Sequence, residues 1–236
     1  MDLTEHIRKV QATMAQAAVN AGRDPGEITL CAATKVQTDD TIRAAIAAGV
    51  PVCGENRVQE LTAHLEHNAY EGARVHFIGH LQTNKVKQVV GKVELIHSVD
   101  SLHLLQAINN QADKLGLIQD FLLEVNIADE ESKGGCTPEL AWELARQSVQ
   151  LDHVRFRGLM AIPPVSTVPG ENRPWFRAMH QLFVDMREKM SDNQGDITYL
   201  SMGMSGDYAD AIAEGSTLIR VGTALFGPRP PMVPRK

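Results

Sequence analysis

The sequence predicts an α/β fold: a single (β/α)8 barrel of the TIM type with one extra helix at its N-terminus. Eight short apolar segments rich in β-forming residues alternate with helical segments, which is typical of a parallel sheet. A length of 236 residues suits one barrel and would be cramped for two full domains. The amino-acid composition does not change along the chain in a way that would mark a second domain. A doubly wound open sheet is the alternative, but no Gly-x-Gly-x-x-Gly motif follows an early strand to support it.

The first elements follow from hydrophobic periodicity. Apolar residues recur at three- and four-residue steps over 3–17, which predicts an amphipathic helix that Gly22 ends. Residues 28–34 are short, apolar and rich in β-formers, and they predict a buried strand with Lys35 at its C-terminal end.

The alanine-rich segment 42–48 predicts the next helix, with Thr38 or Asp39 as its N-cap and Gly49 as its stop. This alternation then repeats along the chain. Further strands are expected at 50–53, 75–78, 94–99, 121–127, 154–162, 197–201 and 218–221. Further helices are expected at 55–67, 83–91, 101–115, 137–150, 173–190 and 206–214. We expect the barrel to span 1–227 and a proline-rich, exposed tail to span 228–236.

Composition narrows the class of protein. Hydrophobic residues make up 43% and charged residues 22%, which is typical of a soluble globular chain. A net charge of −6 argues against nucleic acid and anionic membranes as partners, because neither is attracted by an acidic surface. Three cysteines without CxxC spacing support neither a disulfide framework nor a zinc site. The N-terminus lacks an apolar leader and no apolar run is long enough to span a membrane, so we expect a cytoplasmic protein.

Lys35 is the clearest candidate for chemistry. The C-terminal ends of the strands converge on one face of such a barrel, and active sites of this architecture lie there. An amine in that position is partly desolvated, which lowers its pKa and makes it nucleophilic toward aldehydes. The alternative is an ordinary solvated lysine that follows a strand.

Two further candidates follow the seventh and eighth strands. The turn from Leu200 to Asp207 combines small residues with the hydroxyls of Ser201 and Ser205 just before a helix, and such turns bind phosphate. Its alternative is a plain turn in which Ser205 or Asp207 caps the helix. Arg220, Gly222 and Thr223 end the eighth strand, where Gly222 permits close backbone approach and Thr223 adds a donor. Here the alternative is a structural ion pair made by Arg220.

The three candidates together fit one ligand. Lys35 suits an aldehyde, the two turns suit a phosphate, and Arg220 suits a ring. The sequence therefore predicts pyridoxal 5′-phosphate as the cofactor. Nine histidines are present, but neither HExxH nor a Cys/His spacing indicates a metal site, and we interpret His76 as a residue that satisfies a hydrogen bond within or beside a strand.

Several motifs resemble those of one known family. They are Ala33 to Lys35, Gly54 to Glu60, His76 to Lys85, Gly158 to Ile162, Leu200 to Ser205 and Ile219 to Thr223. Together they are highly specific, and the resemblance covers nearly the whole chain. The sequence is identified as a member of the YggS/PLPBP family of pyridoxal phosphate homeostasis proteins, whose fold is similar to the N-terminal barrel of alanine racemase.

The resemblance implies a role for each site residue. It implies Lys35 as the Schiff-base lysine, Arg220 beside the pyridine nitrogen and Asn56 near the ring. The residues implied around the phosphate are Ser201, Ser205, Gly222 and Thr223. One position departs from the family: many members carry a second lysine two positions after the first, and this chain has Gln37 there. Lys133 matches a lysine of the family, but we interpret it as a solvated loop residue.

The resemblance also implies a function, which is to bind pyridoxal 5′-phosphate and store it or deliver it to apoenzymes, with little or no turnover. The alternative is an amino-acid racemase. A cationic arginine beside the pyridine nitrogen disfavours its protonation and weakens the ring as an electron sink. Related racemases take a second base, a tyrosine, from a further domain that we do not expect here. A cofactor-free aldolase that uses Lys35 is a third possibility, and we expect the protein to be a monomer.

Overall fold

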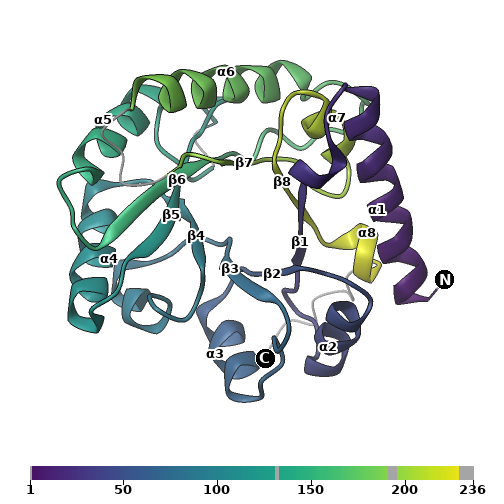
Figure 1. Cartoon of the computed structure of the whole chain (residues 1–236), viewed down its shortest axis with the longest axis horizontal. Coiled ribbons are helices and arrows are strands. Elements are labelled where there is room, and N and C mark those ends of the chain that lie inside the picture. Colours follow the sequence, from purple (N-terminus) through teal and green to yellow (C-terminus); the bar gives the residue numbers. More distant parts are fainter. Residues whose placement is uncertain (1, 131–132, 191–195, 229–236) are drawn as a thin grey trace.

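Eight parallel strands close into a barrel in the order β1 to β8 (Figure 1). The computed structural model describes residues 2–130, 133–190 and 196–228. Strand β1 pairs with both β2 and β8, and these pairings complete the ring. The strands are β1 (Thr29–Ala33), β2 (Val52–Glu55), β3 (Arg74–Phe77), β4 (Leu95–Val99), β5 (Gln119–Glu124), β6 (Val154–Met160), β7 (Tyr199–Ser201) and β8 (Leu218–Val221). The expected (β/α)8 barrel is confirmed.

Helices surround the strands and alternate with them along the chain (Figure 1). They are α1 (Leu3–Asn20), α2 (Asp39–Ala47), α3 (Val58–Glu66), α4 (Leu102–Leu115), α5 (Pro138–Ser148), α6 (Arg173–Lys189), α7 (Tyr208–Ala213) and α8 (Thr223–Phe226), with 3₁₀ helices η1 (Pro25–Glu27) and η2 (Thr83–Gln88). The extra helix α1 packs beside α7 and α8. Because α8 has only four residues, α1 completes the outer layer next to β8 and β1.

Three expected elements differ from the structure. The segment 83–91 forms the 3₁₀ helix η2 and not an α-helix, in keeping with the low helix propensity of its valines. Strand β2 starts at Val52, after Pro51, and runs on through Glu55, so the next helix begins at Val58 and not at 55. Helix α8 was not expected, because four residues carry no periodic signal.

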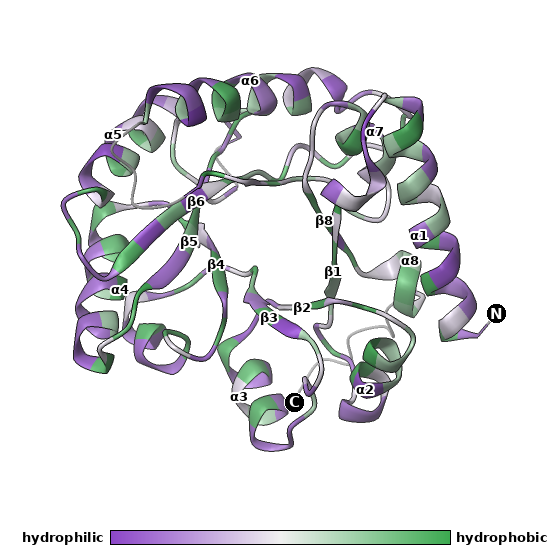
Figure 2. Ribbon diagram, viewed as in Figure 1, coloured by the Kyte–Doolittle hydropathy of each residue, from purple (hydrophilic) through white to green (hydrophobic). Residues whose placement is uncertain are grey.

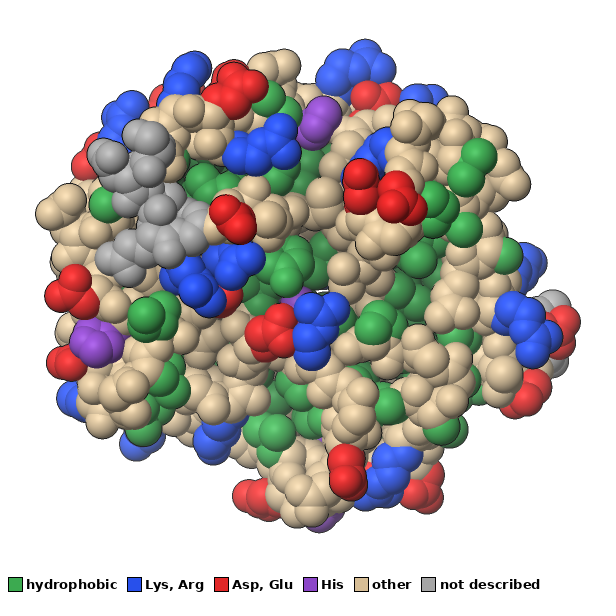
Figure 3. Space-filling view, in the orientation of Figure 1, with side chains coloured by type: hydrophobic (Ala, Val, Ile, Leu, Met, Phe, Trp, Pro, Cys, Tyr) green, Lys and Arg blue, Asp and Glu red, His purple; other side chains and the backbone are tan. Residues whose placement is uncertain are grey.

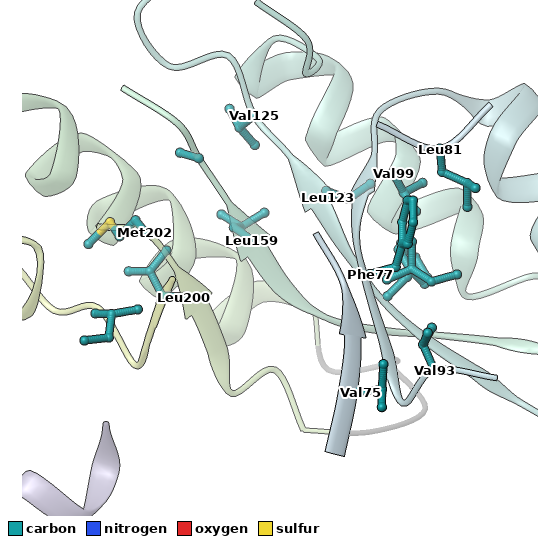
Figure 4. Packing of buried hydrophobic residues seen from close by; sticks show 14 of the residues in the cluster. Val75, Phe77, Leu81, Val93, Val99, Leu123, Val125, Leu159, Leu200 and Met202 are labelled. Carbon is teal, nitrogen blue, oxygen red and sulfur yellow. The ribbon is translucent and has the colours of Figure 1, made fainter. Parts of the chain in front are cut away.

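Side chains alternate between the two faces of the barrel wall, as they do in any strand. The outward residues join one large hydrophobic cluster between strands and helices, and Figure 4 shows part of it around Phe77, Leu123 and Leu200. The helices that cover this cluster carry both hydrophobic and hydrophilic residues, as amphipathic helices must (Figure 2). The inward residues form two small clusters. One contains Cys31, Val52, Ile78 and Leu218, and the other contains Leu95, Leu122 and Met160.

Four polar residues occupy inward positions among these small clusters. His76, His97, Ser201 and Arg220 are all buried, and each neighbours outward-facing residues of the large cluster along its strand. The inside of the barrel is therefore partly polar, and its polar residues lie beneath the C-terminal strand ends.

Two expectations concern the ends of the chain and membranes. In the part of the chain that the structure describes, no helix has the length and hydropathy needed to cross a bilayer. Most of the expected tail, residues 229–236, lies outside the described residues.

Candidate functional site

A small cavity of about 190 Å³ lies where β1, β7 and β8 end. Its lining includes Ala33, Lys35, Gln37, Met204, Ser205, Gly206, Arg220, Gly222, Thr223, Phe226 and Gly227. Five of the seven predicted site residues thus share one cavity, and they come from segments far apart in sequence. Ser201 and Asn56 are not part of the lining. Figure 3 shows an acidic and a basic side chain together at the centre of the face that it presents, and because the cavity lining contains no acidic residue, this charged pair is not part of the cavity.

Lys35 reaches the cavity because the inward register of β1 continues past the strand. Cys31 and Ala33 face inward, and Lys35 is the next residue in that register. Val36 then turns the chain with φ of 60°, a conformation that a β-branched residue rarely adopts. The Val36 amide is held in this turn because it donates to Glu60 Oε2 at 2.8 Å. The loop that carries Lys35 is therefore anchored to α3.

A buried carboxylate supports the same loop from β2. Glu55 Oε1 accepts from Thr34 Oγ1 at 2.5 Å and from the Tyr70 hydroxyl at 3.0 Å. Burial raises the pKa of Glu55, and these two hydrogen bonds oppose that shift. No role for Glu55 was predicted from the sequence, although Glu55 lies in the motif Gly54 to Glu60. A glutamate that ends an otherwise apolar strand is the signal that could have identified it.

Asn56 follows Glu55 directly and so lies beside the Lys35 loop, because β1 and β2 are neighbours. Its Oδ1 atom is buried and has no hydrogen-bond partner among the described residues. A Cβ at position 79 would meet the Asn56 carbonyl oxygen at 2.1 Å, so only Gly79 allows the two loops to approach this closely. The close approach of Gly79 fixes the Asn56 backbone, and its Oδ1 is an acceptor that no described residue uses.

The turn after β7 is tied to the end of β8. Ser205 Oγ accepts from the backbone amides of Gly222 at 3.2 Å and Ala224 at 3.1 Å. Asp207 occupies the N-cap position of α7, and its Oδ1 accepts from the Met204 amide at 2.7 Å. Of the two caps in the plain-turn alternative, Asp207 is the residue at the N-cap position, whereas Ser205 is not the cap, because its hydroxyl accepts from amides at the start of α8.

Gly222 keeps the cavity open on the β8 side. A Cβ at this position would lie 3.4 Å from the Ala33 Cβ, which belongs to the neighbouring strand β1 and also lines the cavity. A larger side chain at position 222 would therefore fill space that a ligand could use.

Arg220 is buried and is fixed by oxygens of the two preceding strands. Its Nη1 donates to the carbonyl of Ser201 at 2.8 Å and to the Ser201 hydroxyl at 2.6 Å. Its Nη2 donates to the carbonyl of Ala161 at 2.9 Å. Among the described residues, no carboxylate lies within ion-pair distance of this guanidinium, so the ion-pair alternative is wrong. Burial lowers the pKa of Arg220, but a guanidinium remains cationic in proteins.

The hydrogen-bonding capacity of Arg220 is not exhausted. A guanidinium has five N–H groups, and the described residues accept from the two groups on Nη1 and from one on Nη2. The Nε–H and the second Nη2–H have no partner within the described residues. Because Arg220 lines the cavity, these donors are suited to an acceptor such as a ring nitrogen.

Ser201 acts on the cavity through Arg220. Its hydroxyl contacts Arg220 Nη1 and also lies 3.0 Å from His97 Nδ1 inside the barrel. His97 Nε2 in turn lies 3.0 Å from His76 Nδ1, which agrees with the hydrogen-bonding interpretation of His76. Sequence patterns do not predict the contact between His97 and Ser201, because it joins strands that are not neighbours.

The side chain of Lys133 is less exposed to solvent than expected. Its Nζ donates to the Pro163 carbonyl at 2.7 Å and pairs with Glu130 at 2.5 Å, and its side chain is only 22% exposed. The interpretation of Lys133 as a solvated loop lysine is therefore wrong. It links the segment after β5 to the segment after β6.

Two larger hollows, of about 680 and 840 Å³, lie on the outer surface among the helices. One is lined mainly by α5 and α6, and the other by residues around α6 and α7. Neither contains Lys35, Ser205 or Arg220. The cavity at the strand ends is smaller, but there an amine, a guanidinium and a glycine-rich turn converge, so it is the better candidate for the functional site.

Comparison with known proteins places this barrel in a family. Residues 26–230 match the family model of the alanine racemase N-terminal domain. The chain belongs to this family of barrels.

Within that family, the chain belongs to the pyridoxal phosphate homeostasis proteins. It is 41% identical over 229 residues to the pyridoxal phosphate homeostasis protein of Aquifex aeolicus, covering 97% of this chain and 99% of that protein. It is 36% identical to the protein of the same name from Escherichia coli, covering 97% of both chains.

Solved structures agree with this assignment. PipY of Synechococcus elongatus, solved with PLP bound, is 32% identical with a TM-score of 0.82, and the match covers 96% of this chain and all of PipY. Alanine racemase of Clostridium difficile is 14% identical with a TM-score of 0.73, and the match covers 96% of this chain but 57% of the racemase. The second likeness shows the shared fold alone.

The forked shape of the guanidinium leads to a testable expectation. In Arg220→Lys an ammonium replaces a planar fork that meets three fixed oxygens, so buried acceptors lose partners. We expect the free energy of unfolding to fall by about 2 kcal/mol or more, measured by urea denaturation.

Arg57→Lys is the matched control, because Arg57 is exposed and, within the described part of the chain, its ion pair is with Glu60. Its unfolding free energy should stay near that of the wild type. Equal stabilities for the Arg220 and Arg57 variants would contradict the anchoring role of the guanidinium.

Proposed function

We propose that this protein binds pyridoxal 5′-phosphate in the cavity at the ends of β1, β7 and β8, and that it stores or delivers the cofactor with little or no turnover. The observation that carries the proposal is that Lys35, Arg220 and the turn after β7 converge on one small cavity. In this turn Ser205 accepts a hydrogen bond from the Gly222 amide. The names of the curated relatives and the PLP-bound PipY structure support it.

The residues present fit the chemistry of this cofactor. Lys35 offers an amine to its aldehyde, and Ser205, Gly222 and Thr223 surround the place proposed for its phosphate. Arg220 has two N–H groups without a partner among the described residues, and these suit the pyridine nitrogen. The Asn56 Oδ1, which also has no described partner, suits a polar group of the ring. We assign Ser201 to the same site through its contact with Arg220.

Arg220 also bears on whether the bound cofactor reacts. When bound, pyridoxal 5′-phosphate supplies an aldehyde that condenses with amines and a ring that withdraws electrons best when its nitrogen is protonated. A guanidinium is a permanent donor and cannot accept or share a proton there. Arg220 therefore favours the unprotonated ring and weak electron withdrawal.

No tyrosine of the chain is placed to act as a second base. The Tyr70 hydroxyl donates to Glu55, and burial together with that carboxylate raises the pKa of Tyr70 far above its usual value. The Tyr199 ring packs against Arg157 and the edge of His76. Tyr208 begins α7 and packs against the hydrophobic core. This arrangement favours binding and release over racemase chemistry.

We also propose that the protein is located in the cytoplasm, a reducing compartment. We propose further that it is a monomer and that PLP-dependent apoenzymes receive the cofactor from it. The three cysteines, Cys31, Cys53 and Cys136, are all free and buried, which supports the location.

The cofactor proposal is tested by covalent labelling. Borohydride reduction of the protein loaded with pyridoxal 5′-phosphate, followed by peptide mass analysis, should place the pyridoxyl group on Lys35. Lys35→Ala should lose the label yet remain folded, because Lys35 lies in a loop beyond β1 and outside the core.

Lys87→Ala is the control, since Lys87 is an exposed lysine remote from the cavity lining. It should label like the wild type. A pyridoxyl group found mainly on another lysine of the wild-type protein would refute the assignment of Lys35.

The carrier proposal is tested by hydrogen exchange at the substrate. The loaded protein should exchange the Cα hydrogen of common amino acids for deuterium far more slowly than about 1 s⁻¹, an ordinary enzymatic rate. The reason is the weak electron sink next to Arg220 and the lack of a placed second base. NMR of the amino acids in D₂O measures this rate, and exchange at 1 s⁻¹ or faster would establish an enzyme instead.

A further inference from the structure

A chain of hydrogen bonds crosses the inside of the barrel and ends on Arg220. His76 Nδ1 lies 3.0 Å from His97 Nε2, and His97 Nδ1 lies 3.0 Å from Ser201 Oγ. Ser201 Oγ lies 2.6 Å from Arg220 Nη1. Strands β4 and β7 are not neighbours in the barrel, so the contact between His97 and Ser201 spans the lumen.

The direction of this chain follows from its end at Arg220. A guanidinium can only donate, so Ser201 Oγ accepts from it. The Ser201 hydroxyl then keeps one proton, and the acceptor available to that proton is His97 Nδ1. His97 must therefore carry its own proton on Nε2 and donate it to His76 Nδ1. His76 in turn carries its proton on Nε2.

The other end of the chain is a carboxylate, which can only accept. His76 Nε2 lies 3.8 Å from Glu94 Oε1, a distance longer than a hydrogen bond, so the attraction there is electrostatic. Glu94 is partly exposed, precedes β4 and also pairs with Arg74 at 3.3 Å. The hydrogen-bonded chain thus runs from the N-terminal side of the barrel to the cavity at the opposite end. Its acceptor end is Glu94 and its donor end is Arg220.

Burial is consistent with the neutral rings that this chain needs. Both His76 and His97 are fully buried. Burial lowers the pKa of each, and the positive charge of Arg220 lowers the pKa of His97 further. A protonated His97 would present N–H groups to both neighbours and could not accept from Ser201.

We propose that His97 and His76 are positioning residues, which form a one-way hydrogen-bonded chain that orients the Ser201 hydroxyl and thereby fixes the Arg220 guanidinium toward the cavity. With His97 as its acceptor, the Ser201 hydroxyl turns its lone pairs to Arg220. Without that acceptor the hydroxyl proton is free to rotate toward the guanidinium and oppose its hydrogen bond. The inference rests on the proposed function only for the identity of the ligand that Arg220 meets.

The protonation pattern is tested on the full chain without added cofactor. Two-bond ¹H–¹⁵N correlation spectra of histidine-labelled protein at neutral pH distinguish the tautomers, and single His→Gln variants assign the signals. We expect His76 and His97 to be neutral, each with its proton on Nε2. A proton on Nδ1 of His97, or a charged ring, would overturn the proposed direction.

The positioning role is tested with two variants of His97. His97→Leu removes the acceptor for Ser201, whereas His97→Gln keeps an acceptor and a donor on one planar group. We expect His97→Leu to weaken binding of pyridoxal 5′-phosphate roughly tenfold, in line with the loss of one hydrogen bond, and to shift the absorption maximum of the bound cofactor. His97→Gln should retain most of the affinity and the original spectrum.

Ser98→Ala is the matched control, because Ser98 is the next residue of β4, equally buried, with a hydroxyl that has no partner among the described residues. It should leave affinity and spectrum unchanged. A wild-type spectrum and affinity in His97→Leu would overturn the positioning role. The histidine tautomers are measured without cofactor. A failure to bind pyridoxal 5′-phosphate would therefore refute the proposed function, while the direction of the hydrogen-bonded chain would still be settled by the tautomers.

A variant at the exposed end keeps the test independent of folding in the core. Glu94→Ala removes the carboxylate that attracts the Nε2 proton of His76, and at an exposed position it should not unfold the barrel. We expect the His76 Nε2–H signal to shift while His76 keeps its proton on Nε2, because His97 still donates to Nδ1. An unchanged His76 signal would overturn the assignment of Glu94 as the end of the chain.

Discussion

The site depends on one buried cation, the guanidinium of Arg220. Burying an unpaired charge is costly, and no carboxylate among the described residues lies close enough to pair with it. Oxygens of Ala161 and Ser201 accept its hydrogen bonds instead. These oxygens come from the C-terminal ends of β6 and β7, so the guanidinium can be held only when those strands and β8 are in register. The closed barrel is therefore a requirement of the site.

The same arrangement explains how one barrel has both a stable core and a polar interior. Outward side chains form the large hydrophobic cluster under the helices, while inward positions combine small apolar clusters with His76, His97 and Ser201. Hydrogen bonds join these polar groups to one another and to Arg220, which lines the cavity. The site that we propose would offer a fixed donor to a ring nitrogen, which suits holding a cofactor more than activating it.

Much of this architecture could be predicted from the sequence, because it depends on local patterns. Alternating strands and helices predicted the barrel, and the positions of Lys35 and Arg220 at strand ends predicted that they meet. Contacts between strands that are not neighbours could not be read in this way. The bond between His97 and Ser201 crosses the lumen, Ser205 serves α8 instead of the helix that follows it, and Lys133 joins two different loops. Each of these contacts depends on the closed barrel and leaves no periodic signal.

The central claim is that Arg220 donates a hydrogen bond to the pyridine nitrogen of bound pyridoxal 5′-phosphate and keeps that nitrogen unprotonated. The most direct test is the ¹⁵N NMR spectrum of the protein loaded with cofactor labelled at this nitrogen. The account predicts a chemical shift typical of an unprotonated, hydrogen-bonded pyridine at neutral pH, with Arg220→Leu moving it. A shift typical of a pyridinium ion in the wild-type protein would contradict the account.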